Sequence, residues 1–138
     1  MAALGITQLA RLQELNARRT ALAGIYLRNL AGISGLDLPK KPNYDFVHPW
    51  HLFIIKVTGR KREKFMAELA EYNIGYGLHF SPAHRLKYVK EKYAVNPDSL
   101  PETERAADRI ISLPLFPDMR DDDALYVCDA IKEIMKHG

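Results

Sequence analysis

Apolar side chains recur at every third or fourth position through the first part of the chain, which is the spacing of one face of an α-helix. Seven positions carry this pattern: Leu9, Leu12, Leu15, Leu22, Ile25, Tyr26 and Leu30. Gly32 and Gly35 follow it, and glycine is common just beyond a helix end. We therefore expect one long amphipathic helix over residues 3 to about 30.

Between this helix and position 80 the pattern changes from loop to strand, then to helix and back to strand. Residues 34–49 contain three prolines and are expected to form a loop. The near-continuous apolar run WHLFIIKV, residues 50–57, is rich in β-branched and aromatic side chains and predicts a central strand. Residues 61–72 have helical spacing, and residues 74–80 predict a short strand.

Helical spacing returns at residues 82–93. Ser99 and Glu102 have the S-x-x-E spacing of a capping box, with Pro101 in the first turn, and predict a helix to about residue 109. ISLPLF, residues 111–116, predicts a short strand. The last helix follows several aspartates and has core spacing at Leu125, Cys128, Ile131, Ile134 and Met135.

With the two helical segments between residues 82 and 109 counted as one, these elements alternate in the order α-β-α-β-α-β-α, without an internal repeat. Strands this few and this short form a small sheet covered by helices, so the expected fold class is α/β (α+β), with a mostly antiparallel sheet. A chain of 138 residues suffices for one core and is too short for two ordinary domains. We expect a single domain over residues 1–138, with a leading helix at 1–31 and an α/β core at 50–138.

Net charge, cysteine content and the lengths of apolar runs indicate which partners and which cellular compartment to expect. The formal net charge of +3 and the pI of about 9.0 do not by themselves imply a polyanionic partner. Cys128 is the single cysteine, which excludes an internal disulfide and suits a reducing compartment. No apolar run approaches the roughly 18 residues that cross a membrane, and the N-terminus does not resemble a secretory signal. The expected location is the cytoplasm, without a membrane partner.

Four histidines stand in two close pairs, His48 with His51 and His79 with His84. Zinc sites usually combine imidazoles with cysteine or carboxylate ligands at tight spacing, and neither pair has such a neighbour. His48 also lies in the proline-rich loop, where a solvated or backbone-bonded imidazole is the usual state. We therefore expect no metal site.

A nucleic-acid platform is an alternative interpretation of two predicted strands. Residues 52–57 resemble the shorter motif of RNA-recognition domains, and residues 75–80 partly match the longer one. Ile74 replaces the basic residue of the longer motif, and Leu78 replaces a base-stacking aromatic. We expect no nucleic-acid partner, and a stand-alone binding module, RNA-recognition-like or regulatory, stays as the alternative function.

Two side chains are candidates for a nucleophile. Cys128 lies on the apolar stripe of the last predicted helix, where a buried, inert thiol is usual. Ser81 is close in sequence to His79 and His84, but the G-x-S-x-G turn of hydrolases is absent, and spacing alone makes no triad. We expect no catalytic residue in this chain.

The succession of motifs resembles one known family. WHLFIIKV is followed by a predicted helix, then by GYGLHFSPAH, LPETE, ISLPLFPDM and DDDALYVCDAI. This order is similar to the C-terminal domain of the DegT-type sugar aminotransferases, which are pyridoxal-phosphate enzymes acting on nucleotide-linked keto-sugars. The segment ITQLARLQELNARR also resembles the helix that leads into the small domain of that family. The resemblance covers nearly the whole chain.

The resemblance implies the small domain of a fold-type I aminotransferase. The parent enzyme would move an amino group from glutamate, leaving 2-oxoglutarate, to a nucleotide-linked keto-sugar for lipopolysaccharide or lipid A. In the family, the Schiff-base lysine and the groups that hold the cofactor lie in a separate large domain. None of the lysines of this chain matches the motif that surrounds that lysine. The resemblance therefore implies pyridoxal phosphate in the full-length enzyme, and no bound cofactor and no activity in this chain alone.

The resemblance also assigns candidate substrate-binding residues. The GLHF turn of the family lies at the cleft between the domains, so His79 is the first candidate for a contact to the amino-donor carboxylate or the sugar. His84 and Tyr88 are further candidates that would shape the pocket. The leading helix lies near the dimer interface in the family, and its apolar stripe predicts a homodimer through Leu4, Leu9, Leu12 and Leu15.

Overall fold

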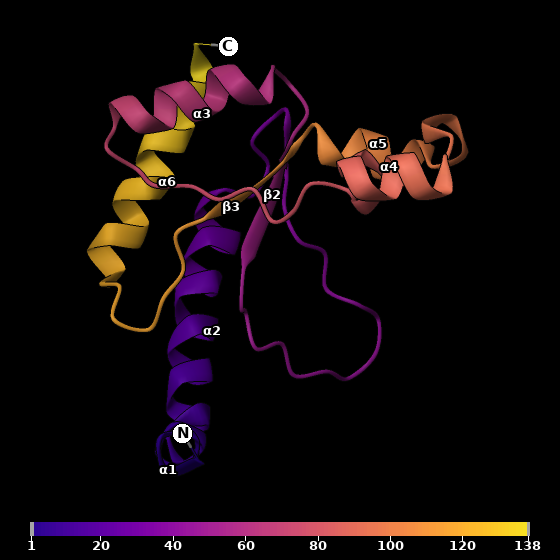
Figure 1. Cartoon of the computed structure of the whole chain (residues 1–138). Coiled ribbons are helices and arrows are strands. Elements are labelled where there is room, and N and C mark those ends of the chain that lie inside the picture. The colour runs from indigo at the N-terminus through magenta and orange to yellow at the C-terminus, as the bar shows by residue number, and fades with distance from the viewer. Residues whose placement is uncertain (1, 138) are drawn as a thin grey trace.

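The computed structural model describes residues 2–137, and Figure 1 shows how their elements are arranged. In chain order, with η marking a 3₁₀ helix, they are α1 (Ala2–Ala10), α2 (Leu12–Asn29), β1 (Leu36–Asp37), β2 (Phe53–Val57), α3 (Arg62–Glu71), η1 (Ala83–Arg85), α4 (Lys87–Tyr93), η2 (Pro97–Ser99), α5 (Pro101–Ala107), β3 (Ile110–Leu113) and α6 (Asp121–Lys136). Helices α2, α3 and α6 gather beside the sheet, whereas α4 and α5 stand apart from them (Figure 1).

The sheet has three strands in the order β1-β2-β3, and both pairings are antiparallel. Alternate residues of β2 are buried, because successive side chains of a strand point to opposite faces. One face, called the inner face here, presents Phe53, Ile55 and Val57 to the helices. The outer face carries Ile54, opposite Ser112, and Lys56, opposite Ile110. The expected α/β (α+β) class with a small antiparallel sheet is confirmed.

The core fills the space between the inner face and helices α2, α3 and α6. Tyr26 of α2 lies at its centre: its ring centroid is 4.9 Å from that of Phe53, and its hydroxyl donates to the Pro114 carbonyl at 2.7 Å. Burial, with the neighbouring Cys128, raises the pKa of Tyr26 above its usual value. The largest fully buried side chains come from all of these elements: Tyr26, Phe53, Phe65, Leu22, Leu30, Ile55, Leu69, Ile111 and Ile131.

Two glycines allow the chain to cross itself beside the sheet. Gly35 has a φ of +76°, and a Cβ built on it would lie 2.5 Å from the Cα of Gly59. The Gly35 carbonyl accepts hydrogen bonds from the Thr58 and Gly59 amides, at 2.8 and 3.0 Å. The crossing therefore needs glycine for its backbone conformation and for its close approach.

Residues 83–107 form a helical arm that contains η1, α4, η2 and α5 (Figure 1). Arg85 holds its two halves together, donating to both carboxylate oxygens of Glu104 and, at 2.8 Å, to Asp108. Arg62 of α3 donates to the Ala107 carbonyl and attaches the base of the arm to the body. Polar contacts, more than apolar packing against the core, therefore hold the arm together and attach it to the body of the domain.

The prediction of one long leading helix is wrong in one respect, because the helix is broken at Arg11. The Arg11 amide bonds the Gln8 carbonyl, three residues back rather than four, and α2 restarts at Leu12. The Thr7 hydroxyl donates to the Ala3 carbonyl, a contact that tends to bend helices. Every residue of α1 is exposed, so tertiary packing does not hold α1 in line with α2.

Two expectations about strands also need correction. Residues 36–37 lie within the predicted loop but form β1, which pairs with Val57 and Lys56 at the glycine crossing. Residues 74–80, expected as a strand, form only one isolated bridge, between Gly77 and Ser112. The segment that partly matched the longer RNA-recognition motif is therefore mostly irregular.

Helix starts were only partly predicted. Ser99 does not cap α5, because its hydroxyl donates to the Asn96 carbonyl within η2. At the start of α6 the Asp123 carboxylate accepts hydrogen bonds from the Arg120 amide at 3.1 Å and from the Arg120 guanidinium at 3.0 Å. On α6 itself, Cys128, Ile131 and Ile134 are buried as expected, whereas Leu125 is 39% exposed.

Candidate functional site

The turn at residues 75–80 lies against the edge of β3 through a pair of backbone hydrogen bonds. The Gly77 amide donates to the Ser112 carbonyl at 3.0 Å, and the Ser112 amide donates back to Gly77 at 2.8 Å. The bridge extends the sheet beyond the β3 edge, and the Ser112 side chain, opposite Ile54 in the register, lies on the outer face. The bridge also places the next polar side chain, His79, beside that face.

His79 is half-buried, and its imidazole folds back over Gly77. A Cβ on Gly77 would lie 2.1 Å from the His79 Cε1 atom, so a side chain at this position would displace the imidazole. The His79 Nδ1 atom lies 3.0 Å from the Ser112 Oγ atom. Its Nε2 atom has no hydrogen-bond partner in residues 2–137 and is not among their buried unpaired atoms, so it reaches solvent.

His84 faces the helical arm instead. Its side chain is buried, and its Nε2 atom lies 2.5 Å from the Glu104 Oε1 atom, which also accepts from Arg85. Hydrogen bonds from Arg85 and then His84 lower the pKa of Glu104 to about 2, and the pairing with Glu104 and Asp108 raises the pKa of Arg85. His84 is thus engaged in fastening the arm.

Tyr88 lies on the exposed side of α4. Its hydroxyl accepts a hydrogen bond from the Lys92 ammonium at 2.8 Å, and that ammonium lies 5.2 Å from its ring centroid. The three predicted site residues therefore have three different surroundings. Of them, only His79 combines a fixed ring with a free polar atom.

The other candidates from the sequence have structural surroundings. Cys128 is buried on α6, and burial raises the pKa of its thiol to about 11, so the thiolate is disfavoured. The His48 Nδ1 atom accepts the Trp50 amide at 2.9 Å, and the two rings stack with centroids 4.1 Å apart. Ser81 is exposed.

Sequence reasoning did not identify Ser112 as part of the site. The only signal was a hydroxyl residue inside an apolar strand run, at a position that the register places on the outer face. Its partner in the turn lies 33 positions earlier, and periodicity cannot connect residues so far apart. Glu104 was missed for the same reason.

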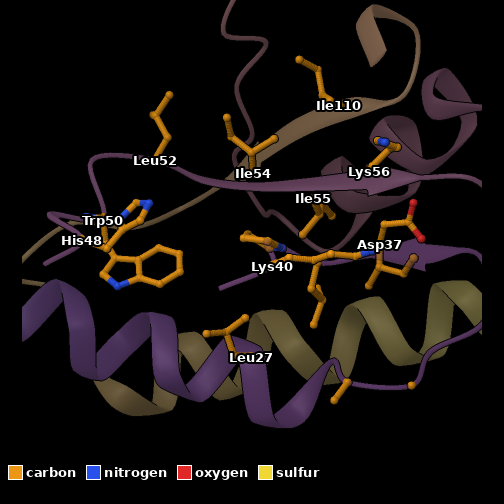
Figure 2. A pocket seen from close by; sticks show the side chains of 15 residues that line it. Leu27, Asp37, Lys40, His48, Trp50, Leu52, Ile54, Ile55, Lys56 and Ile110 are labelled. Atoms are coloured by element: carbon orange, nitrogen blue, oxygen red, sulfur yellow. Dashed lines mark hydrogen bonds between the residues drawn. The ribbon is translucent and has the colours of Figure 1, made fainter. Parts of the chain in front are cut away.

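A groove of about 960 Å³ lies between the β1 edge of the sheet and the end of α2 (Figure 2). Figure 2 shows Trp50 and His48 close together at one end and Asp37 and Lys56 at the other. Ile54 of the outer face also lines the groove. Ile54 is opposite Ser112 in the register, so the groove reaches the outer face, but the groove lies at the β1 edge and the His79 turn at the β3 edge of the sheet.

This groove does not fit pyridoxal phosphate, the cofactor that the family resemblance implies. A Schiff-base lysine and an acid for the ring nitrogen must reach different ends of the cofactor. Among the described residues that line the groove, Asp37 is the one acid; it is the direct cross-strand partner of Lys56 and stands three residues before the other lining lysine, Lys40. The groove also adjoins Ala31 and Gly32, beyond the C-terminal end of α2. The macrodipole is negative there and disfavours a phosphate.

Two further observations concern ions and membranes. Within residues 2–137, no group of three or more histidine, cysteine, aspartate or glutamate side chains is arranged to hold a metal ion. Over the same range, no helix has the length and apolar character needed to span a bilayer.

Comparisons with known proteins place the whole fold. DesV from S. venezuelae, solved in complex with a ketimine intermediate, is 36% identical and superposes with a TM-score of 0.89, over 98% of this chain and 36% of that chain. Spr1654 from Streptococcus pneumoniae is 25% identical: its apo and PMP forms superpose with a TM-score of 0.89 over 99% of this chain and 34% of that chain, and its PLP form with a TM-score of 0.88 over 99% and 35%.

Helicobacter pylori PseC, an aminotransferase of pseudoaminic acid biosynthesis, shares the fold at 19% identity, with a TM-score of 0.89 over 99% of this chain and 37% of that chain. This chain thus spans about a third of the length of these relatives. A model of the DegT/DnrJ/EryC1/StrS aminotransferase family matches residues 1–132. The chain belongs to the DegT/DnrJ/EryC1/StrS aminotransferase family.

Proposed function

We propose that this chain acts as the C-terminal small domain of a pyridoxal-phosphate-dependent aminotransferase that moves an amino group from glutamate to a nucleotide-linked keto-sugar. The family match over residues 1–132 supports the class of reaction. Since the chain spans about a third of its solved relatives, the Schiff-base lysine would come from a large domain, on the same or another polypeptide. The domain alone, residues 1–138, is then inactive.

The finer assignment rests on motif similarity. WHLFII, GLHF and SLPLFPDM in this chain are similar to the corresponding segments of UDP-4-amino-4-deoxy-L-arabinose–oxoglutarate aminotransferases. We therefore propose a UDP-linked 4-keto-sugar as substrate and an enzyme that works in the cytoplasm, in lipid A or lipopolysaccharide biosynthesis.

The observation that carries the proposal is the geometry of His79. Its Nδ1 atom is held by Ser112, its ring lies over Gly77, and within residues 2–137 its Nε2 atom has no partner and can meet a ligand. Such an atom can bind an oxygen of the amino-donor carboxylate or of the sugar. Pyridoxal phosphate supplies the carbanion stabilisation in this chemistry, and the protein supplies binding and orientation.

His84 and Tyr88 have secondary roles in this proposal. His84 would act indirectly, because its imidazole pairs with Glu104 and fixes the base of the arm that follows the His79 turn. Tyr88 would reach a ligand only from the exposed side of α4.

A chimeric enzyme tests the function. The matching C-terminal third of DesV would be replaced by residues 1–132 of this chain, with the cofactor absorbance of the large domain reporting that the chimera is folded. We expect amino transfer from glutamate to a UDP-linked 4-keto-sugar. His79→Gln should lower kcat/KM roughly 10- to 100-fold, as expected for loss of a hydrogen bond to a charged group, whereas exposed His51→Gln should have little effect. A folded, cofactor-loaded chimera that transfers nothing to sugar substrates would contradict the proposal.

A further inference from the structure

The starting observation is a buried hydroxyl with one partner. Ser112 is 4% exposed, and within residues 2–137 its Oγ atom has His79 Nδ1 as its single hydrogen-bond partner. The backbone amide and carbonyl of Ser112 are engaged with Gly77. Among the described residues, His79 Nδ1 is therefore the one acceptor within reach of the Ser112 hydroxyl.

A neutral imidazole carries its proton on one nitrogen and accepts on the other. If Nδ1 carried the proton, it would donate to Ser112 Oγ, and the buried hydroxyl proton would then have no acceptor. If Nε2 carries the proton, the Ser112 hydroxyl donates to Nδ1 and both groups are satisfied. A buried donor without an acceptor is costly, so the second arrangement is favoured.

The orientation of the ring is settled by the same neighbours. A half-turn of the imidazole would bring a carbon atom, Cδ2, to the place of Nδ1 and leave the Ser112 hydroxyl unpaired. The absence of a side chain at Gly77 gives the ring the space that it occupies, since a Cβ there would lie 2.1 Å from Cε1. Ser112 and Gly77 together thus define which His79 atom faces solvent.

We propose that Ser112 is a positioning residue that fixes neutral His79 in the Nε2–H tautomer, so that the site presents a hydrogen-bond donor to an oxygen atom of its ligand. The role of His79 as a hydrogen-bond donor to substrate rests on the proposed function, whereas the tautomer assignment does not. In this form His79 does not accept a proton from the substrate through Nε2. Its ligand atom is a carboxylate, carbonyl or hydroxyl oxygen.

The tautomer can be measured on the chain of 138 residues without any ligand. Two-bond ¹⁵N–¹H spectra of the imidazoles, recorded at about pH 8.5 where an ordinary imidazole is neutral, separate protonated from unprotonated nitrogens. The His79→Gln variant identifies the His79 signals by their loss, and exposed His51 supplies the unrestrained reference. We expect His79 to be Nε2–H, with a tautomer ratio roughly tenfold above that of His51.

Ser112→Ala is expected to bring the tautomer ratio of His79 back to that of His51, and Ser112→Thr, which keeps a hydroxyl, to restore the bias. Ser99→Ala removes a hydroxyl that bonds only the exposed Asn96 carbonyl, and should leave His79 unchanged. An Nδ1–H ring in the wild-type chain, or a ratio unaffected by Ser112→Ala, would overturn the proposal. The wild-type measurement decides even if a variant fails to fold.

The two proposals fail in different ways. A chimera without aminotransferase activity, together with an Nε2–H His79, would reject the proposed function and leave the tautomer assignment standing. An active chimera with an Nδ1–H His79 would reject the assignment alone. In an active chimera, Ser112→Ala should lower kcat/KM roughly tenfold, with partial recovery in Ser112→Thr.

Discussion

At the scale of single residues, Tyr26 links α2 both to β2 and to the segment after β3. Its ring packs on β2, and its hydroxyl bonds the carbonyl of Pro114, just after β3. Tyr26→Phe keeps the ring but leaves that carbonyl without its donor. We expect the free energy of unfolding to fall by about 1–3 kcal/mol, the usual cost of an unpaired buried polar group, as measured by urea denaturation.

Tyr88→Phe is the matched control for this change. The Tyr88 hydroxyl is exposed and bonds only Lys92 on its own helix, so its removal should alter the unfolding free energy by less than about 0.5 kcal/mol. Equal losses in the two variants would show that the Pro114 bond does not contribute as described.

At the scale of elements, the helical arm should respond to acid before the core does. Glu104 has its pKa lowered to about 2 by Arg85 and then His84, against an ordinary value of 4.5. A carboxyl with a lowered folded-state pKa contributes its full stabilisation above its unfolded pKa and loses it as pH falls toward the folded value. We therefore expect NMR signals of residues 83–107 to shift and broaden between about pH 4.5 and 2, ahead of those of α2.

Two neighbouring carboxylates provide the comparison. Glu104→Gln should loosen the arm at neutral pH and remove most of this acid response, although Asp108, also bonded to Arg85, keeps part of it. Glu102→Gln alters only an exposed pair with Arg105 on the same helix and should leave the response intact. A core that loosens at the same pH as the arm would contradict this account.

Elements that are amphipathic and packed on the core were predictable from the sequence, and elements defined by distant partners were not. The apolar spacing of Phe65 and Leu69 placed α3, because burial of one helix face is a local pattern. The two residues of β1 form a strand only because Gly35 and Gly59 bring them to β2. Ser99 has capping spacing, but the η2 turn engages its hydroxyl first.

The same distinction holds for the site. His79 was identified through a motif, which is local in sequence, and its supporting residue Ser112 was not. His84 came from the same motif, yet its contact to Glu104 depends on how the arm folds back. A family motif indicates which residues matter, whereas their roles depend on side chains that only the fold brings near.

At the scale of the whole molecule, the exposed side chains of α1 bear on assembly. Leu4, Ile6 and Leu9 are 61, 70 and 70% exposed, and Leu12, at the start of α2, is 44% exposed. Adjoining exposed apolar side chains favour association, and two-fold pairing is the commonest way to cover a single stripe. We propose that the chain forms a homodimer through α1 and the start of α2. Sedimentation across a concentration series would detect this dimer.

Leu9→Glu combined with Leu12→Glu should convert the dimer to a monomer without lowering the unfolding free energy of the monomer, since both side chains are exposed. Val47→Glu, at a 91% exposed position in the loop before β2, is the control and should leave the mass unchanged. A chain that sediments as a monomer at every concentration would contradict the proposal.

The crossing of Gly35 and Gly59 has a consequence for how this sequence can vary. Each glycine occupies the space where a side chain of the other would begin: a Cβ on Gly59 would lie 2.9 Å from the Gly35 Cα. Neither glycine can therefore be replaced alone without a clash, and replacing both adds a second clash. In a library of single substitutions in this domain, we expect variants at Gly35 and Gly59 to fail to fold as often as variants at buried core positions, although Gly59 lies at the surface.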